Sequence, residues 1–439
     1  MFAIETAEKK IIDRAMVVGV RSPEEPESAA AEHLHELEEL VRNLEIEVAL
    51  TEVVKLRTVQ VHYYVGSGRA AEIAAAFEES RCDILVFDAE LTPSQQRNWE
   101  RLVKHPVVER REIILDIFAQ RAITQEARLQ VELAQMEYSL PRLKRAWTHL
   151  SRQQGGARGT RGEGEKQIEY DRRFVQRRIA SLKVELEEVR KRRATMRKSR
   201  QKSPVPKAAI VGYTNVGKSS LLNALGGETA PGEDKLFATL DPATRRVELG
   251  GNSALIMTDT VGFVRKLPHT LVAAFKSTLE EAVFADFLVV VLDVASEYLE
   301  EHWETTIGVL AELGAADKEM VVVFNKCDLP HDETLETRAR GLFPHGLFVS
   351  VKTGRGLDEL RAELARLARR HRGVLEVALP PERSDLAALA HRCGEVIEEK
   401  YDEAGNLSMI FSIGARYEEQ YEPFRVKDGV KRSGRRVSS

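Results

Sequence analysis

The chain has 439 residues, which is too long for one ordinary core because domains average about 100 to 200 residues, so two to four domains are expected. Its longest apolar run, "FLVVVL", is far shorter than the roughly 20 residues of a membrane span, and its three cysteines are too far apart for a disulfide framework or zinc site, so a cytoplasmic location is expected. The net charge is −4, yet residues 142–202 hold 20 Lys and Arg against 7 Asp and Glu, a local charge of +13 that leaves −17 on the remainder and is typical of a surface facing a polyanion.

Residues 1–112 alternate short apolar runs such as "RAMVVGV" and "DILVFD" with helical patterns such as "TPSQQRNWERLV". Alternation of this kind predicts a small α/β domain with a mainly parallel sheet. The stretch "YYVGSGRAAEI" places Gly66 and Gly68 before a helix. A turn with a helix cap is favoured there over a second anion or nucleotide site, because one GxG is a weak signal.

Residues 113–203 carry two apolar seams with alternating spacings of four and three residues, which predict an antiparallel helical hairpin. The seams are Leu129, Leu133, Met136, Leu140, Leu143 and Trp147, and Val175, Ile179, Leu182, Leu186 and Val189. Pro141 is expected to kink the first helix. Between the arms lies "QQGGARGTRGEGEK", a glycine-rich basic tip suited to insertion among RNA phosphates. The alternative is a solvated coiled coil with no ligand.

A rigid linker, "SPVPK", precedes residues 204–370, in which a strand, a glycine loop and a helix are followed by repeated βα units. The loop "GYTNVGKS" matches G-x-x-x-x-G-K-[ST], whose backbone N–H groups wrap phosphates at a helix N-terminus. Its residues are Gly212, Tyr213, Thr214, Asn215, Val216, Gly217, Lys218 and Ser219. Lys218 is expected to contact the β- and γ-phosphates and Ser219 to ligate Mg²⁺.

The base is selected by "VVVFNKCDL", where Asn325, Lys326, Cys327 and Asp328 follow an apolar strand. The carboxylate of Asp328 can accept hydrogen bonds from guanine N1–H and the exocyclic amine, whereas adenine would leave it unpaired. In "FVSVKTG", a backbone N–H within Ser350, Val351 and Lys352 is expected to meet guanine O6. GTP is therefore the predicted substrate, with Mg²⁺ as cofactor.

Two further segments should respond to the γ-phosphate. In "LFATLDPATRR", Thr239 is preferred over Thr244 as the Mg²⁺ ligand, within the run Phe237, Ala238, Thr239, Leu240 and Asp241. The second segment is "DTVGF", with Asp259, Thr260, Val261 and Gly262. Many GTPases place a water-orienting Gln next, but here Phe263 follows, which is equally consistent with a plain packing residue and cannot replace the glutamine. With Lys218, Thr239 and Gly262 as the expected catalytic groups and no residue to orient water, intrinsic hydrolysis should be slow.

Residues 371–439 predict a small α+β domain and tail. The predicted fold class is thus α/β: a P-loop GTPase domain preceded by a small α/β domain and a helical hairpin, and followed by a small α+β C-terminal domain. The order of the motifs excludes a circularly permuted GTPase.

Several stretches, among them "FDAELTPSQQRNWE", "LQVELAQMEYSLPRL", "GGARGTRGEGEKQIEYDRR" and "DTVGFVRKLPHTLVAAFKSTLEE", resemble the HflX family of ribosome-associated GTPases. The resemblance covers roughly residues 85–285 and, with the base motifs, extends to about 370. It implies a cytoplasmic GTPase, monomeric off the ribosome, that docks on the large ribosomal subunit and splits or rescues ribosomes under stress. It also implies that the hairpin contacts ribosomal RNA, with Arg158, Arg161, Arg172 and Arg173 as candidates.

The glycine-rich loop departs from the family wording GG-x-GTRGPGE, because Ala157 and Arg158 separate its glycine groups and Glu163 replaces the proline. Two rival functions remain open. One is a GTPase that assists ribosome assembly or RNA modification, and the other is a regulatory switch acting through protein partners.

Overall fold

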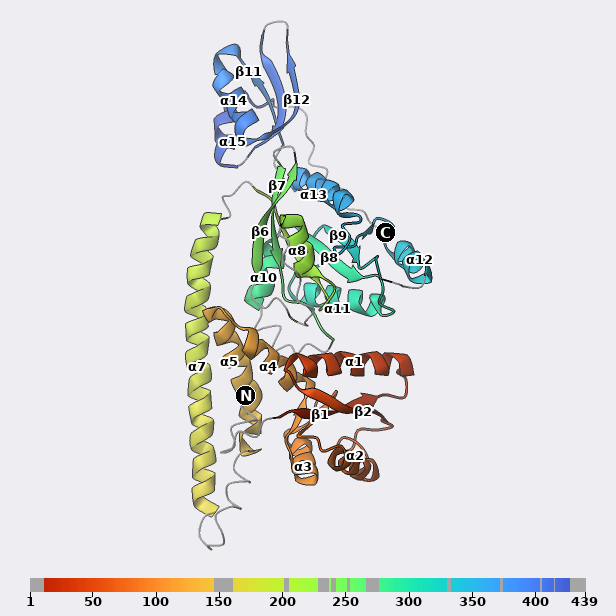
Figure 1. Ribbon diagram of the computed structural model, residues 1–439. Helices are drawn as coiled ribbons and strands as arrows, with labels where there is room; N and C mark the ends of the chain where they lie inside the picture. Colours follow the sequence, from red (N-terminus) through yellow and green to blue (C-terminus); the bar gives the residue numbers. More distant parts are fainter. Residues whose placement is uncertain are drawn as a thin grey trace. The chain divides into compact units, whose positions relative to one another are not determined.

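The computed structural model describes residues 12–145, 161–200, 205–227, 237, 242–250, 253–265, 276–329, 333–371, 374–402, 405–413 and 415–426. The chain forms two compact units. The first comprises Met1–Arg190, Glu233–Asp241 and Val264–Thr278, and the second comprises Lys191–Gly232, Pro242–Phe263 and Leu279–Ser439. Figure 1 shows the elements of both. No helix among the described residues is long and apolar enough to cross a membrane.

The first unit contains a four-stranded parallel sheet in the order β2-β1-β3-β4, which confirms the predicted parallel α/β domain. Its strands are β1 (Arg14–Arg21), β2 (Glu47–Lys55), β3 (Ile84–Phe87) and β4 (Val107–Glu109), and its helices are α1 (Glu27–Asn43), α2 (Ser67–Glu79) and α3 (Pro93–Val103). All four residues of β3 are buried, as expected of a strand covered on both faces. Thr92 and Gln95 form a capping box that fixes the start of α3.

Four helical segments follow the sheet: α4 (Arg110–Arg121), α5 (Gln125–Ser139), the 3-10 helix η1 (Leu140–Arg145) and α7 (Arg161–Arg200). The apolar seams of α5 and α7 pack together over one cluster, and the two helices lie side by side in Figure 1, so the hairpin prediction is confirmed. Trp147 lies outside the described residues. Pro141 does not kink a continuing helix; α5 ends at Ser139 and the chain tightens into η1.

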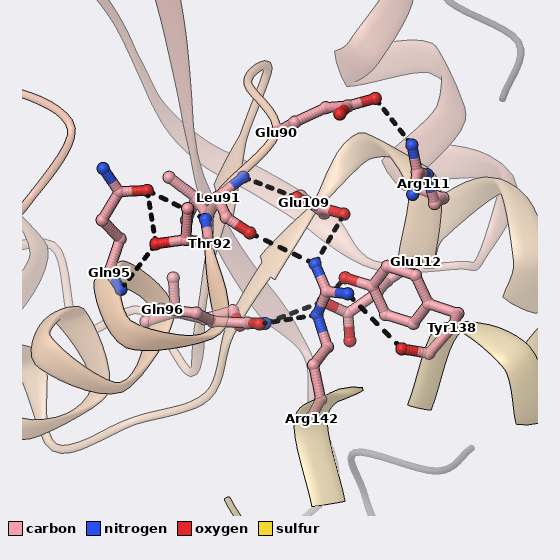
Figure 2. Close-up of polar contacts among 11 residues, drawn as sticks. Glu90, Leu91, Thr92, Gln95, Gln96, Glu109, Arg111, Glu112, Tyr138 and Arg142 are labelled. Carbon is pink, nitrogen blue, oxygen red and sulfur yellow. Dashed lines mark hydrogen bonds and ion pairs between the residues drawn. The ribbon is translucent and has the colours of Figure 1, made fainter. Parts of the chain in front are cut away.

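Beyond Pro141, the side chain of Arg142 enters a buried polar network that joins η1 to the loop before α3 and to β4 (Figure 2). Its guanidinium donates to the Leu91 carbonyl and to Glu109, both at 3.2 Å. The base of the hairpin is therefore fixed to the α/β sheet by charge and hydrogen bonds as well as by apolar packing.

The second unit is built on a six-stranded mixed sheet in the order β10-β9-β8-β5-β7-β6, in which only the edge strand β6 is antiparallel. Its strands are β5 (Lys207–Gly212), β6 (Ala243–Gly250), β7 (Ser253–Asp259), β8 (Phe287–Asp293), β9 (Met320–Asn325) and β10 (Leu347–Phe348). Its helices are α8 (Lys218–Gly226), α10 (Lys276–Phe284), α11 (Leu299–Glu312), α12 (Glu333–Leu342) and α13 (Leu357–His371). The carboxyl ends of parallel strands meet at one edge, where such sheets bind ligands.

The described residues between 374 and 426 form an antiparallel three-stranded sheet in the order β11-β13-β12, with helices packed on it. These elements are β11 (Val374–Leu379), α14 (Ser384–Cys393), β12 (Glu395–Tyr401), β13 (Leu407–Ser412) and α15 (Ala415–Tyr421), with 3-10 turns at Pro381–Arg383 and Glu422–Phe424. The fully buried Tyr421 donates a hydrogen bond to the Leu386 carbonyl at 2.8 Å and anchors α15 to α14. The predicted α+β character is therefore confirmed.

Candidate nucleotide-binding site

The glycine loop connects β5, which ends at Gly212, to α8, which begins at Lys218. Gly212 and Gly217 have φ angles of 147° and 92°, which side chains rarely adopt. A Cβ at Gly212 would lie 2.3 Å from the Val291 carbonyl oxygen, and one at Gly217 would lie 2.3 Å from Asn325 Nδ2. Only glycine fits at either position, so the loop can pass close to β8 and to the base-selecting loop.

Lys218 stands at the amino end of α8 and is buried. Its ammonium donates to the Tyr213 carbonyl at 2.6 Å, across the loop. Burial lowers the pKa of Lys218 to about 8, although the nearby Asp259 carboxylate acts in the opposite direction. The Thr214 hydroxyl in the same loop is buried and has no hydrogen-bond partner among the described residues. A desolvated ammonium, an unsatisfied hydroxyl and a helix N-terminus fit a phosphate group.

GDP binding is expected to take up about half a proton near pH 8, because a lysine with a pKa of about 8 must become fully charged to pair with phosphate. Affinity should consequently fall as the pH rises above 8. Calorimetry in two buffers of different ionisation enthalpy measures the proton count. In Lys218→Arg, whose guanidinium is always charged, the residual binding should take up no proton. Negligible uptake by the unmodified protein would contradict the lowered pKa.

The expected Mg²⁺ ligands are only partly within the described residues. The Ser219 hydroxyl donates to Asp259 Oδ2 at 2.6 Å, and hydroxyl and carboxylate oxygens are the donors that Mg²⁺ prefers. Ala238, Thr239, Leu240 and Asp241 lie outside the described residues, whereas Phe237 lies within them. Thr244, the rejected alternative, is in β6, where its hydroxyl is 3.0 Å from that of Thr258. Among the described residues, no group of three or more His, Cys, Asp and Glu could hold a metal alone.

The DTVG segment follows β7 and lies against the glycine loop. The Thr260 hydroxyl donates to the Ile210 carbonyl at 2.7 Å, and Val261 is buried. Phe263 is only 1% exposed, and its backbone pairs with the loop: Thr214 N–H donates to the Phe263 carbonyl at 2.8 Å, and Phe263 N–H donates to the Gly212 carbonyl at 3.1 Å. Phe263 is therefore a core residue, as the packing alternative predicted, and its backbone continues the pairing of β7 with β5.

The base-selecting residues meet after β9 and β10. Asn325 Nδ2 donates to the Val216 carbonyl at 2.8 Å, which ties this loop to the glycine loop as predicted. The Ser350 hydroxyl donates to Asp328 Oδ1 at 2.6 Å and holds the pKa of that carboxyl below its usual range, so Asp328 is ionised and can accept hydrogen bonds. The Val351 N–H, expected to meet guanine O6, donates to Asn325 Oδ1 at 3.2 Å.

Lys326 pairs with an acidic residue that the sequence did not predict. It has a left-handed backbone, with φ of 68°, and its ammonium is 2.8 Å from the carboxylate of Asp293 at the end of β8. Asp293 was not among the predicted site residues; its place at the carboxyl end of a buried strand was the available signal. Cys327 contributes to the loop through its backbone, because its N–H donates to the Val349 carbonyl. Burial raises the pKa of its thiol, so the side chain stays a neutral thiol. Lys352 follows Val351 in an exposed turn.

Two of the four arginines that were expected to contact RNA lie within the described side chains of the hairpin. Arg172 and Arg173 are exposed on α7, and Arg173 pairs with Glu169 at 3.1 Å. Arg161 begins α7, but its side chain and all of Arg158 lie outside the described residues.

Three family models match the chain. The "GTP-binding GTPase N-terminal" model covers residues 31–119, the "GTP-binding GTPase Middle Region" model covers 121–200, and the "50S ribosome-binding GTPase" model covers 207–326. Among solved structures, the chain is similar to a GTP-binding protein from Sulfolobus solfataricus in complex with GDP, with 25% identity, 82% of this chain and 99% of that chain covered, and a TM-score of 0.43.

Curated relatives match over nearly the whole chain. A protein named GTPase HflX from Akkermansia muciniphila is 48% identical over 409 residues, covering 91% of this chain and 94% of its own. The GTPase HflX of Escherichia coli K12 is 40% identical over 379 residues, covering 86% and 89%. Together with a P-loop sheet, a guanine-type base loop and the basic hairpin in one chain, these matches show that the protein binds and hydrolyses GTP and belongs to the HflX family of GTPases.

Proposed function

We propose that this GTPase associates in the cytoplasm with the large ribosomal subunit, and that ribosome-stimulated GTP hydrolysis lets it split or rescue ribosomes under stress. The observation that carries the proposal is the coexistence, in one chain, of a GTPase site with Phe263 where many GTPases have a water-orienting Gln, and of a positively charged helical arm. The family model over residues 207–326 is named for 50S ribosome binding, which supports the same partner.

Hydrolysis at this site would rely on positioning and charge neutralisation, which provide most of the acceleration in phosphoryl transfer. Lys218 would neutralise the β- and γ-phosphates, Ser219 and Thr239 would hold Mg²⁺, and the Gly262 N–H would contact the γ-phosphate. Phe263 is buried, so its side chain does not approach a water molecule at the phosphate. The missing contribution is assigned to the ribosome, and the protein is expected to be monomeric and slow away from it.

The RNA-binding role is assigned to the hairpin. Residues 142–202 carry +13, and the apolar seam packs α7 against α5. Arg172 and Arg173 face solvent there, where they can meet phosphates. Arg178 instead forms a two-pronged ion pair with Glu132 of α5, at 2.7 and 2.9 Å, and stabilises the hairpin itself.

Purified protein should sediment with large ribosomal subunits when a non-hydrolysable GTP analogue is present, and less with GDP. The subunits should raise its hydrolysis rate by about 1,000-fold or more, the scale of help that a partner supplies in trans to other switch GTPases. A splitting role further requires that whole ribosomes become subunits on a sucrose gradient. Equal hydrolysis rates with and without subunits would overturn the proposal.

The role of the hairpin in binding ribosomal subunits is tested by measuring binding at different salt concentrations and in charge-reversal variants. Binding to subunits should weaken by at least about 100-fold between roughly 50 and 200 mM salt if the arm contacts several phosphates. Arg172→Glu combined with Arg173→Glu should weaken it further at fixed salt. The control Arg366→Glu alters an exposed arginine of α13 paired with Glu363 and should leave it unchanged. A flat salt response would favour a solvated coiled coil and a protein partner.

A further inference from the structure

We propose that Asp88, which lies outside every nucleotide motif, is a positioning residue for GTP binding and hydrolysis that acts through Arg265 on Gly262 and Phe263. Arg265 immediately follows "DTVGFV", yet it belongs to the first compact unit together with Asp88, whereas Phe263 belongs to the second. The chain thus passes from one unit to the other directly after the segment that should sense the γ-phosphate. The inference goes beyond the ribosomal function and uses only the roles proposed above for Lys218 and Gly262.

Asp88 directly follows the strand β3 and is 4% exposed. Its two carboxylate oxygens accept from different arginines: Oδ2 from Arg265 Nη2 at 3.0 Å, and Oδ1 from Arg110 Nη1 at 3.0 Å. Arg110 also pairs with Glu36. Charged hydrogen bonds at buried sites are strong and directional, so Asp88 fixes the position of Arg265.

The arrangement also permits release of Arg265. Removing one partner of a buried ion pair is costly when it leaves the other charge uncompensated. Here Asp88 would keep Arg110, and Arg110 would keep Glu36, if Arg265 moved away. The Asp88 carboxylate therefore has an arginine partner whether Arg265 is bound or released. A contact that must break when GTP binds and form again afterwards requires this property.

Gly262 shows what the contact holds in place. A Cβ on Gly262 would lie 2.8 Å from Lys218 Nζ and 2.9 Å from Thr214 Cα, so this glycine rests directly against the glycine loop. A γ-phosphate contacted by both the Lys218 ammonium and the Gly262 N–H must lie between them. The segment must consequently move outward when GTP binds, and the Asp88–Arg265 contact three residues away opposes that movement.

A second contact of the same kind involves the other nucleotide-sensitive segment. Phe237, two residues before the expected Mg²⁺ ligand Thr239, also belongs to the first unit. Its carbonyl accepts from Arg121 Nη1 at 2.9 Å, and its buried ring meets Phe118 edge-to-face with centroids 4.6 Å apart. Its φ of 55° is uncommon for an aromatic residue and persists only where the surroundings enforce it. Arg121 and Phe118 therefore hold Phe237 as Asp88 holds Arg265, and each held residue is close in sequence to a group expected to sense the γ-phosphate.

The test compares nucleotide affinities without ribosomes, so its outcome is independent of the proposed partner. In Asp88→Asn, binding of a fluorescent non-hydrolysable GTP analogue should tighten about fivefold or more relative to GDP, the usual scale of coupling between sites. GDP affinity itself should stay within about twofold, since GDP lacks the phosphate that requires movement. Single-turnover hydrolysis should accelerate as well.

Arg265→Gln should give the same shift, and the double variant should add nothing further, because both changes remove one contact. Arg265→Gln leaves Asp88 paired with Arg110, so it tests the proposal even if Asp88→Asn fails to fold. Glu90→Gln removes an exposed ion pair with Arg111 in the same unit and should leave the affinity ratio unchanged. The proposal would be overturned if Asp88→Asn or Arg265→Gln, once folded, kept the original ratio of GTP-analogue affinity to GDP affinity, whatever its stability.

Discussion

Asp328→Asn is expected to weaken GTP binding by at least about 100-fold and to make a xanthine nucleotide the preferred ligand. The carboxylate accepts from guanine N1–H and from the exocyclic amine, whereas the amide nitrogen of Asn would oppose a donor with a donor. Xanthine carries a carbonyl in place of that amine, so the Asn amide can donate to it. Competition of GTP and XTP against a fluorescent guanine nucleotide measures the change.

Ser350→Ala provides the matched control for this substitution. The Ser350 hydroxyl orients Asp328 at 2.6 Å and keeps its pKa low, but it leaves the second carboxylate oxygen for the base. Removing it should cost about tenfold or less and preserve guanine preference, since one supporting hydrogen bond is lost and none to the base. If Asp328→Asn still preferred GTP, the assignment of this loop as the base-selecting site would be wrong.

The parts of this molecule that the sequence predicted are those fixed by neighbours along the chain. The glycine loop between β5 and α8 needs a strand, specific glycines and a helix start, all of which are visible within about twenty residues. The seams of α5 and α7 were equally visible, because a helix brings residues three and four apart onto one face. The four-segment division of the chain rests on the same local patterns and stays a prediction.

What the sequence did not predict depends on pairs far apart in the chain. Arg265 and Asp88 are 177 positions apart, and Arg121 and Phe237 are 116 apart. Periodicity carries no information about such pairs, and an arginine after a glycine motif has no preferred partner. For Phe263 the sequence offered a packing role and the absence of glutamine, but not the backbone hydrogen bonds that join the end of β7 to Gly212 and Thr214. Pro141 was assigned a kink because propensity alone does not distinguish a kink from an end.

Arg142→Met is expected to destabilise the protein by about 3 to 5 kcal/mol, which is the cost of leaving a buried charge without its partner. The Cζ atom of the Arg142 guanidinium lies 3.7 Å from the centre of the Tyr138 ring, and its Nε donates to Gln96 Oε1 at 3.3 Å (Figure 2). The guanidinium also pairs with Glu109, which is 2% exposed. Glu109 Oε2 meanwhile accepts from the Leu91 N–H at 2.7 Å, so its carboxylate is fixed and cannot turn to solvent. Urea denaturation, followed at the transition in which the first compact unit unfolds, measures the lost free energy of unfolding.

The pH dependence separates an ionic role for Arg142 from simple packing. Burial already raises the pKa of Glu109, and Arg142 is the largest influence lowering it. Without Arg142 the folded-state pKa rises further, so Glu109 binds a proton on acidification and the unpaired charge disappears. A raised folded-state pKa favours the fold at low pH, and the loss should therefore be smaller at pH 5 than at pH 8.

Three variants complete this experiment. Arg142→Lys keeps the charge but not the planar group that donates from Nη2 to Glu109 while Nε donates to Gln96, so it should recover only part of the stability. Glu109→Gln in the Arg142→Met background should recover part of it at pH 8, since the buried carboxylate that lost Arg142 is no longer charged. Arg173→Met removes an exposed pair on α7 and should cost about 1 kcal/mol or less. A loss in Arg142→Met that is equal at pH 5 and pH 8 would assign the effect to packing, and the hairpin would then be held to the sheet by shape instead of charge.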